Sequence, residues 1–157
     1  MKLICNFLYY ISNGKICFGA CKTNCKKKIM TLKYFKYSEF DSPDQRGSGK
    51  HMSNEFMQML DDARGLAEIP FVITSGYRTE AYQDDLTRRG YKTAKKGTSP
   101  HLKGVAADIA CSNSRDRWII INALVLAGFS RIGIADTFIH VDLSTYEGHR
   151  QNVIWTY

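Results

Sequence analysis

Two short segments constrain the fold most, because each alternates apolar side chains with small or polar ones. In residues 138–143, FIHVDL, an extended strand would place His140 and Asp142 on one face and three apolar side chains on the other. In residues 104–110, GVAADIA, Asp108 stands among small and apolar residues, where an unpaired carboxylate would be costly. Both segments therefore predict half-buried strands that carry acids and a histidine along one wall of a cleft.

The rest of the sequence predicts a mixture of helices and strands without a strict β-α-β alternation. Helical spacing of apolar residues and capping residues predict helices from Ser53 or Asn54 to Ala67, from Glu80 to Arg88, and from Ser112 to Ala127. Runs rich in β-branched and aromatic residues predict further strands at Ile69–Ile73, Arg131–Ala135 and Asn152–Tyr157. Residues 34–51 are rich in turn formers and predict a surface segment. The pattern favours an α+β domain with a small, mainly antiparallel sheet flanked by helices.

The charge distribution divides the chain near Met30. The 157 residues include 22 Lys and Arg against 15 Asp and Glu, but the first thirty residues hold six lysines and no acid. The same thirty residues contain four of the five cysteines, and the remaining residues are nearly neutral. We therefore expect a basic, Cys-rich leader over residues 1–30 and one domain over residues 31–157.

The leader permits several interpretations. Lys2 followed by apolar residues resembles a weak signal peptide, but no clean cleavage site follows. Cys17, Cys21 and Cys25 would share one face of a helix and could hold a soft metal, although the CxxC spacing usual for zinc is absent. We favour a leader without stable structure, or a translated upstream region with Met30 as the working start. No apolar run approaches the roughly 18 residues that span a bilayer, so a multi-span membrane protein is excluded.

Three of the residues in strand-like settings form a metal-ligand set. His101, Asp108 and His140 offer two imidazoles and one carboxylate, which matches the three protein ligands of catalytic zinc, with the fourth position left to water. The other two histidines, His51 and His149, have charged neighbours and are interpreted as surface residues.

Arg78 and Ser99 are candidates for binding a substrate. Arg78 follows a predicted strand, and its planar fork suits a carboxylate or a carbonyl oxygen; the alternative is a surface arginine at the start of a helix. Ser99 could hydrogen-bond a bound peptide, but on spacing alone we favour an ordinary loop serine.

Taken together, these motifs resemble a known family. SGYRT at residues 75–79, SPHLKGVAAD at 99–108 and HVD at 140–142 are similar to the zinc D-alanyl-D-alanine carboxypeptidases and dipeptidases, and closest to their small single-domain phage and bacterial branch. The resemblance covers residues 31–157. It implies the α+β fold shared with the hedgehog signalling domain. It also implies zinc bound by His101, Asp108 and His140, with Arg78 near the scissile bond and Ser99 binding substrate.

The sequence departs from this family at the catalytic base. Members often place an acid three residues before the last zinc histidine, and here that position is Thr137. Asp136 is the favoured base because strand periodicity places it on the face of His140, and Asp142 is the runner-up. Asp142 could instead orient a metal ligand.

We therefore expect a zinc-dependent peptidase that cleaves peptidoglycan stem peptides as a D-alanyl-D-alanine carboxypeptidase or a related endopeptidase. The alternative is a zinc-stabilised domain that holds cell-wall peptide without cutting it. We expect a monomer that binds no nucleic acid and meets a membrane only through the leader. Such a protein would act on the cell wall, either after export or on release from the cytoplasm during phage lysis.

Overall fold

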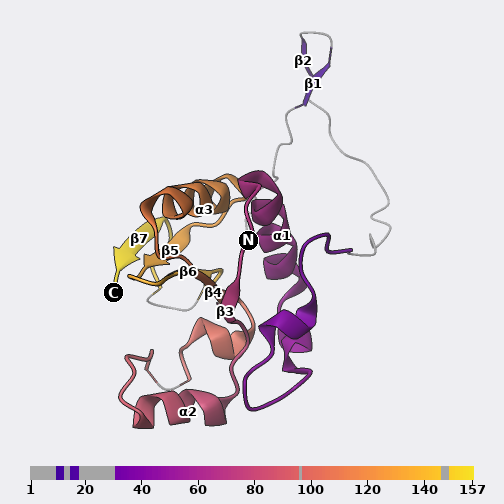
Figure 1. Ribbon diagram of the computed structural model, residues 1–157. Helices are drawn as coiled ribbons and strands as arrows, with labels where there is room; N and C mark the ends of the chain where they lie inside the picture. The colour runs from indigo at the N-terminus through magenta and orange to yellow at the C-terminus, as the bar shows by residue number, and fades with distance from the viewer. Residues whose placement is uncertain (1–9, 13–14, 18–30, 96, 146–148) are drawn as a thin grey trace, which may run out of the picture.

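The computed structural model describes residues 10–12, 15–17, 31–95, 97–145 and 149–157 (Figure 1). Within the leader, β1 (Tyr10–Ser12) and β2 (Lys15–Cys17) form an antiparallel pair. Most of the leader, including Cys21 and Cys25, lies outside the described residues, so its role stays a prediction. No helix in the described part of the chain is long and apolar enough to cross a membrane.

The remainder is an α+β domain, as the sequence predicts. Its helices are α1 (Asn54–Ala67), α2 (Glu80–Arg88) and α3 (Ser114–Leu126). Its sheet has the order β3-β4-β6-β5-β7, formed by Ile73–Ser75, Ala106–Ala110, Phe138–Asp142, Arg131–Ile134 and Val153–Thr156. All neighbouring strands pair antiparallel except β5 and β7, which are parallel. Three short 3₁₀ turns complete it: η1 (Tyr37–Phe40), η2 (Ser48–His51) and η3 (Pro100–Lys103).

Side-chain caps fix where the helices begin. Ser53 accepts a hydrogen bond from the Phe56 amide at the start of α1, and Thr79 caps α2 in the same way. For α3 the cap is Asn113, one residue after the predicted start at Ser112, and its side chain accepts from the Asp116 amide. All three helices thus lie within two residues of their predicted ends.

Three sequence predictions need correction. The strand predicted at Ile69–Ile73 begins only at Ile73, because Pro70 has no amide to donate to a ladder. The next strand begins at Ala106, because Gly104 is left-handed (φ 66°) and a Cβ there would overlap the carbonyl oxygen of His51. The predicted surface segment 34–51 contains Phe40, which is fully buried.

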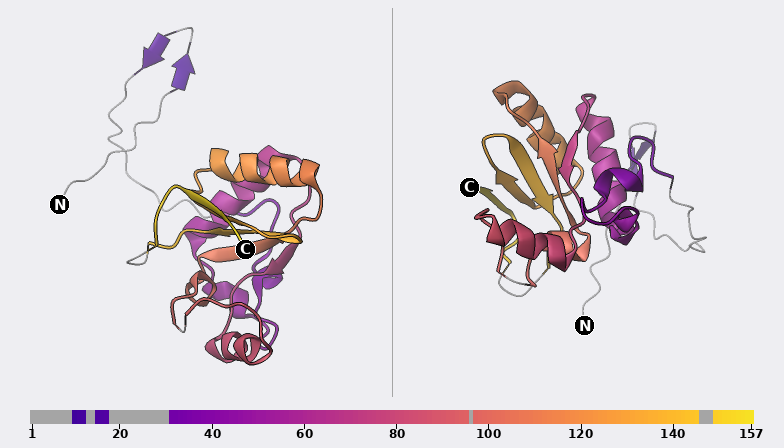
Figure 2. Two further views of the ribbon diagram at one scale, coloured as in Figure 1. Left: turned by 90° about the vertical axis from the view of Figure 1, so that its left-hand side faces the viewer. Right: turned by 60° about the horizontal axis from the view of Figure 1, so that its bottom comes forward.

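The sheet has one apolar and one polar face. The apolar face carries Ala107, Ile109, Ile132, Ile139 and Val141, all buried in the core. Helices α1 and α3 cover this side, whereas α2 lies on the opposite side of the sheet (Figure 2, left). The polar face, between the sheet and α2, is where the chemistry-bearing residues gather.

Candidate metal centre

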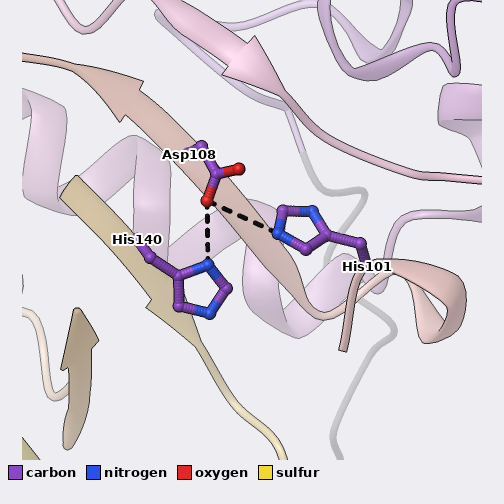
Figure 3. A group of neighbouring side chains, drawn as sticks. All are labelled: His101, Asp108 and His140. Carbon is purple, nitrogen blue, oxygen red and sulfur yellow. Dashed lines mark hydrogen bonds and ion pairs between the residues drawn. The ribbon is translucent and has the colours of Figure 1, made fainter. Parts of the chain in front are cut away.

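Strand register brings the predicted metal ligands together. Asp108 of β4 is directly opposite His140 of β6, and η3 supplies His101. The distance from Asp108 Oδ1 is 2.8 Å to His140 Nδ1 and 3.4 Å to His101 Nε2 (Figure 3). One ligand atom from each residue lies within 4.8 Å of the others, and all three residues are buried. This spacing allows one metal ion to be bound by all three side chains.

In each imidazole the outer nitrogen, the one not directed at Asp108, already has a hydrogen-bond partner. His101 Nδ1 lies 2.7 Å from the carbonyl oxygen of Gly76, and His140 Nε2 lies 3.0 Å from Asp142 Oδ2. A carbonyl and a carboxylate can only accept, so both nitrogens carry hydrogen and donate. The inner nitrogens, His101 Nε2 and His140 Nδ1, are therefore the ones directed at Asp108. Metal-binding histidines are commonly oriented by such outer partners, so the donor set fits zinc.

Burial and charge act in opposite directions within this cluster. Burial lowers the pKa of His101 below its usual value. Burial would raise the pKa of Asp108, but the two histidines outweigh it and hold that pKa well below its usual range. For His140, burial lowers the pKa, and hydrogen bonds to Asp108 and Asp142 more than compensate and raise it. A metal at Nδ1 of His140 would therefore displace a proton.

Arg78 lies against the cluster and pairs with a predicted metal ligand. Its Nη2 donates to Asp108 Oδ2 at 2.9 Å, and its Nε donates to Ser75 Oγ at 2.8 Å. The buried Gln83 of α2 lies 3.4 Å from Nη1 through its Oε1. These contacts fix the guanidinium at the edge of the cavity that contains the cluster.

Asp142 is buried and has both oxygens engaged. Oδ1 accepts from Arg131 Nε at 2.7 Å and from the Ser144 amide at 2.8 Å, and Oδ2 faces His140. Burial would raise the pKa of Asp142, but the hydrogen bonds from His140 and Arg131 outweigh it and lower that pKa. A carboxylate with a lowered pKa is a weak proton acceptor.

Asp136 and Ser99 end in different places. Asp136 is exposed in the turn between β5 and β6, where Arg117 binds its carbonyl oxygen, and it lines no cavity near the cluster. Strand periodicity does not apply to it because β6 begins only at Phe138. Ser99 is buried immediately before η3 and lines the cavity. The structure thus brings together every predicted site residue except Asp136.

Two cavities meet at Arg78 and Asp108. A cavity of about 340 Å³ contains all three predicted ligands, and a neighbouring cavity of about 560 Å³ extends along β3 and α2. The smaller one is also lined by residues that sequence reasoning did not assign to the site: Arg131, His149, Trp155 and Tyr157.

One of these residues, Trp155, lies in β7, and its place in the site depends on how β7 pairs with β5. Trp155 is opposite Gly133 in β5, which in turn is opposite His140. A Cβ on Gly133 would lie 2.7 Å from the indole, so only glycine leaves room for the ring to lie beside His140, at 5.7 Å between ring centres. The one available sequence signal was the isolated glycine in a strand, which often marks a close approach.

Comparison with known protein families finds a match for most of the chain. A sequence model of the Peptidase M15 family matches residues 33–142, a range that contains the whole His101, Asp108 and His140 cluster. The comparison with curated proteins finds no match for the chain.

Proposed function

Because the chain belongs to the Peptidase M15 family, we propose that it is a zinc peptidase that hydrolyses peptidoglycan stem peptides next to D-alanine or a related residue. The observation that carries the proposal is the buried His101, Asp108 and His140 cluster, whose inner nitrogens and carboxylate converge within 4.8 Å. Buried acid and imidazole groups that converge on one point in a cavity are typical of a catalytic metal site.

In this proposal each residue has a separate task. His101, Asp108 and His140 hold zinc, which when bound supplies Lewis-acid activation of water and of the scissile carbonyl. Arg78, fixed beside Asp108, donates to the carbonyl oxygen as negative charge develops on it. Ser99 binds the peptide from the cavity wall.

Asp142 is assigned to positioning. Its Oδ2 fixes the tautomer of His140, and Arg131 keeps the carboxylate ionised, which suits a group that orients a ligand better than a proton acceptor. Among the described residues that line the smaller cavity, Asp108 and Asp142 are the only acids.

The scarcity of acids among the described residues of this cavity favours one alternative function. With Thr137 in the family's acid position and Asp136 exposed in a turn, the domain could bind zinc and cell-wall peptide without cutting it. This alternative predicts binding without product.

One experiment separates the two. The purified chain is incubated with a pentapeptide that ends in D-Ala-D-Ala, with zinc or with a chelator, and mass spectrometry records fragments alongside metal content. We expect zinc-dependent release of D-alanine or a larger fragment. We expect His101→Ala to lose both zinc and cleavage, and the matched His51→Ala, at an exposed histidine outside both cavities, to lose neither. If the zinc-loaded protein releases no fragment, the peptidase proposal is rejected for this substrate.

A further inference from the structure

We infer that Arg131 is a carboxylate-binding residue of the substrate cavity, and that it selects peptides carrying a carboxylate one residue beyond the bond to be cleaved. The inference rests on the proposed peptidase function and assigns a specificity residue to it. Arg131 begins β5, and no sequence motif points to it.

The guanidinium of Arg131 is buried and held in a fixed position. The residue is 9% exposed, its Nε donates to Asp142 Oδ1, and its Nη1 donates to the carbonyl oxygen of Arg150. The Trp155 ring lies 5.3 Å from its central carbon. An arginine fixed on three sides loses little further entropy when it binds a ligand.

The remaining nitrogen, Nη2, is available to a ligand. Among the described residues Nη2 has no hydrogen-bond partner, whereas Nε donates to Asp142 and Nη1 donates to the carbonyl oxygen of Arg150. It is also not sealed in the interior, since the only sealed and unpartnered side-chain nitrogens in the described part belong to Gln83 and Arg117. Arg131 lines the cavity that contains the metal cluster, so Nη2 retains access to that cavity.

The charges around this cavity favour an anion. Arg78, Lys92 and Arg131 line it against two acids, Asp108 and Asp142, and zinc would add further positive charge. The neighbouring cavity differs, because Glu39 and Asp41 line it. A substrate carboxylate is therefore expected in the smaller cavity, and the rest of the peptide in the larger one.

The position of Arg131 relative to the cluster indicates which part of the peptide it meets. Arg78 follows β3 and pairs with Asp108 of β4, whereas Arg131 begins β5, on the other side of His140 in the strand order. Arg131 lines the smaller cavity, where the substrate carboxylate is expected, so we assign the leaving side of the peptide to Arg131. A carboxylate there is either the chain end, as in a carboxypeptidase substrate, or a carboxylate within a longer peptide.

The test compares matched peptides and therefore does not depend on perfect folding of a variant. Three forms of the D-Ala-D-Ala pentapeptide are used: the free acid, the C-terminal amide, and the free acid with its internal carboxylates amidated. For wild type we expect one amidation to lower kcat/KM roughly 10- to 100-fold, as expected for loss of a charge-assisted hydrogen bond. A lower kcat/KM for the C-terminal amide identifies the carboxylate at the chain end as the ligand. A lower kcat/KM for the peptide with internal amides identifies a carboxylate within the peptide.

Variants link that preference to Arg131. In Arg131→Gln the ratio of kcat/KM between acid and amide should fall to about one, and in Arg131→Lys it should be intermediate because charge remains but the fork is lost. Because the ratio is measured within one protein, damage to the Asp142 pair affects both peptides alike. Arg115→Gln, at an exposed arginine of α3, should keep the wild-type ratio.

A binding readout keeps the inference testable apart from catalysis. Calorimetry with metal-free protein measures the affinity for the same three peptides, and Arg131→Gln should remove the preference there too. In one outcome the zinc-loaded protein cuts no peptide, while the metal-free wild type still binds the acid more tightly than the amide and Arg131→Gln does not. That result rejects the proposed peptidase function and upholds the inference about Arg131. Equal affinities of wild type for acid and amides, or an unchanged preference in Arg131→Gln, overturn the inference.

Discussion

Replacing Asp142 by Asn should weaken zinc binding by changing the tautomer of His140. Asp142 accepts three hydrogen bonds, from Arg131 Nε at 2.7 Å, from the Ser144 amide at 2.8 Å and from His140 Nε2 at 3.0 Å. Asn has one acceptor oxygen, and the two donors on the Oδ1 side will hold it. Its NH₂ group then faces His140 Nε2, so that nitrogen must become an acceptor and Nδ1 keeps the proton. Nδ1 is the atom through which His140 would bind the metal.

The expected loss of zinc affinity can be scaled from other metal sites in which the hydrogen-bond partner of a metal-binding histidine is removed. Such changes cost about 10- to 100-fold in metal affinity. Removing one charge of the buried Arg131–Asp142 pair also destabilises the fold, by up to about 3–5 kcal/mol. Chelator competition measures the zinc affinity, urea unfolding measures the free energy of unfolding, and nitrogen NMR reports the His140 tautomer. Asp136→Asn, at the exposed turn, serves as the control and should change none of these.

The same variant tests the role of Asp142. If Asp142 orients His140, Asp142→Asn loses zinc affinity but recovers most of its turnover at saturating zinc. Wild-type zinc affinity with an unchanged tautomer and abolished turnover would refute this reasoning and identify Asp142 as the general base.

Three further predictions concern stability. Gly133→Val should destabilise the fold by about 1–3 kcal/mol in urea unfolding, because its Cβ would lie 2.7 Å from the Trp155 ring; an unchanged midpoint would contradict the packing described. Asp61→Ala should cost about 2–5 kcal/mol, because the buried carboxylate accepts amide hydrogens from residues 33–35, whereas the exposed Asp62→Ala should be nearly neutral in the same assay. Because the pKa of Asp142 is lowered in the fold, its carboxylate stabilises the metal-free protein above about pH 4, the usual aspartate range, and this stabilisation is lost as the pH falls further. The free energy of unfolding of wild type should therefore fall more steeply below about pH 4 than that of Asp142→Asn, and equal slopes would contradict this.

The sequence predicted the elements and the ligands largely through local rules. Ser53 and Thr79 mark helix starts because a side-chain cap acts within three residues, and alternation around His140 fixes which face of β6 is polar. The ligand motif needs only residue type and order, so His101 and Asp108 could be selected without knowing the fold.

The failures occurred where a local rule was applied beyond its element. Asp136 was placed beside His140 by strand periodicity, yet the chain turns between β5 and β6 and carries it into solvent. His149 was similarly interpreted as a surface residue because of its charged neighbours, yet it is half-buried and lines the smaller cavity.

What only the tertiary structure decided is how distant strands align. The sequence by itself determined the α+β class and the ligand types, because spacing, capping and side-chain chemistry are properties of neighbouring residues. Register between β6, β5 and β7 is set by packing of the whole sheet, and it alone places Arg131 beside Asp142 and Trp155 beside His140. Those contacts join residues far apart in sequence, so no local pattern encodes them, and they orient the ligands and give the cavity its charge.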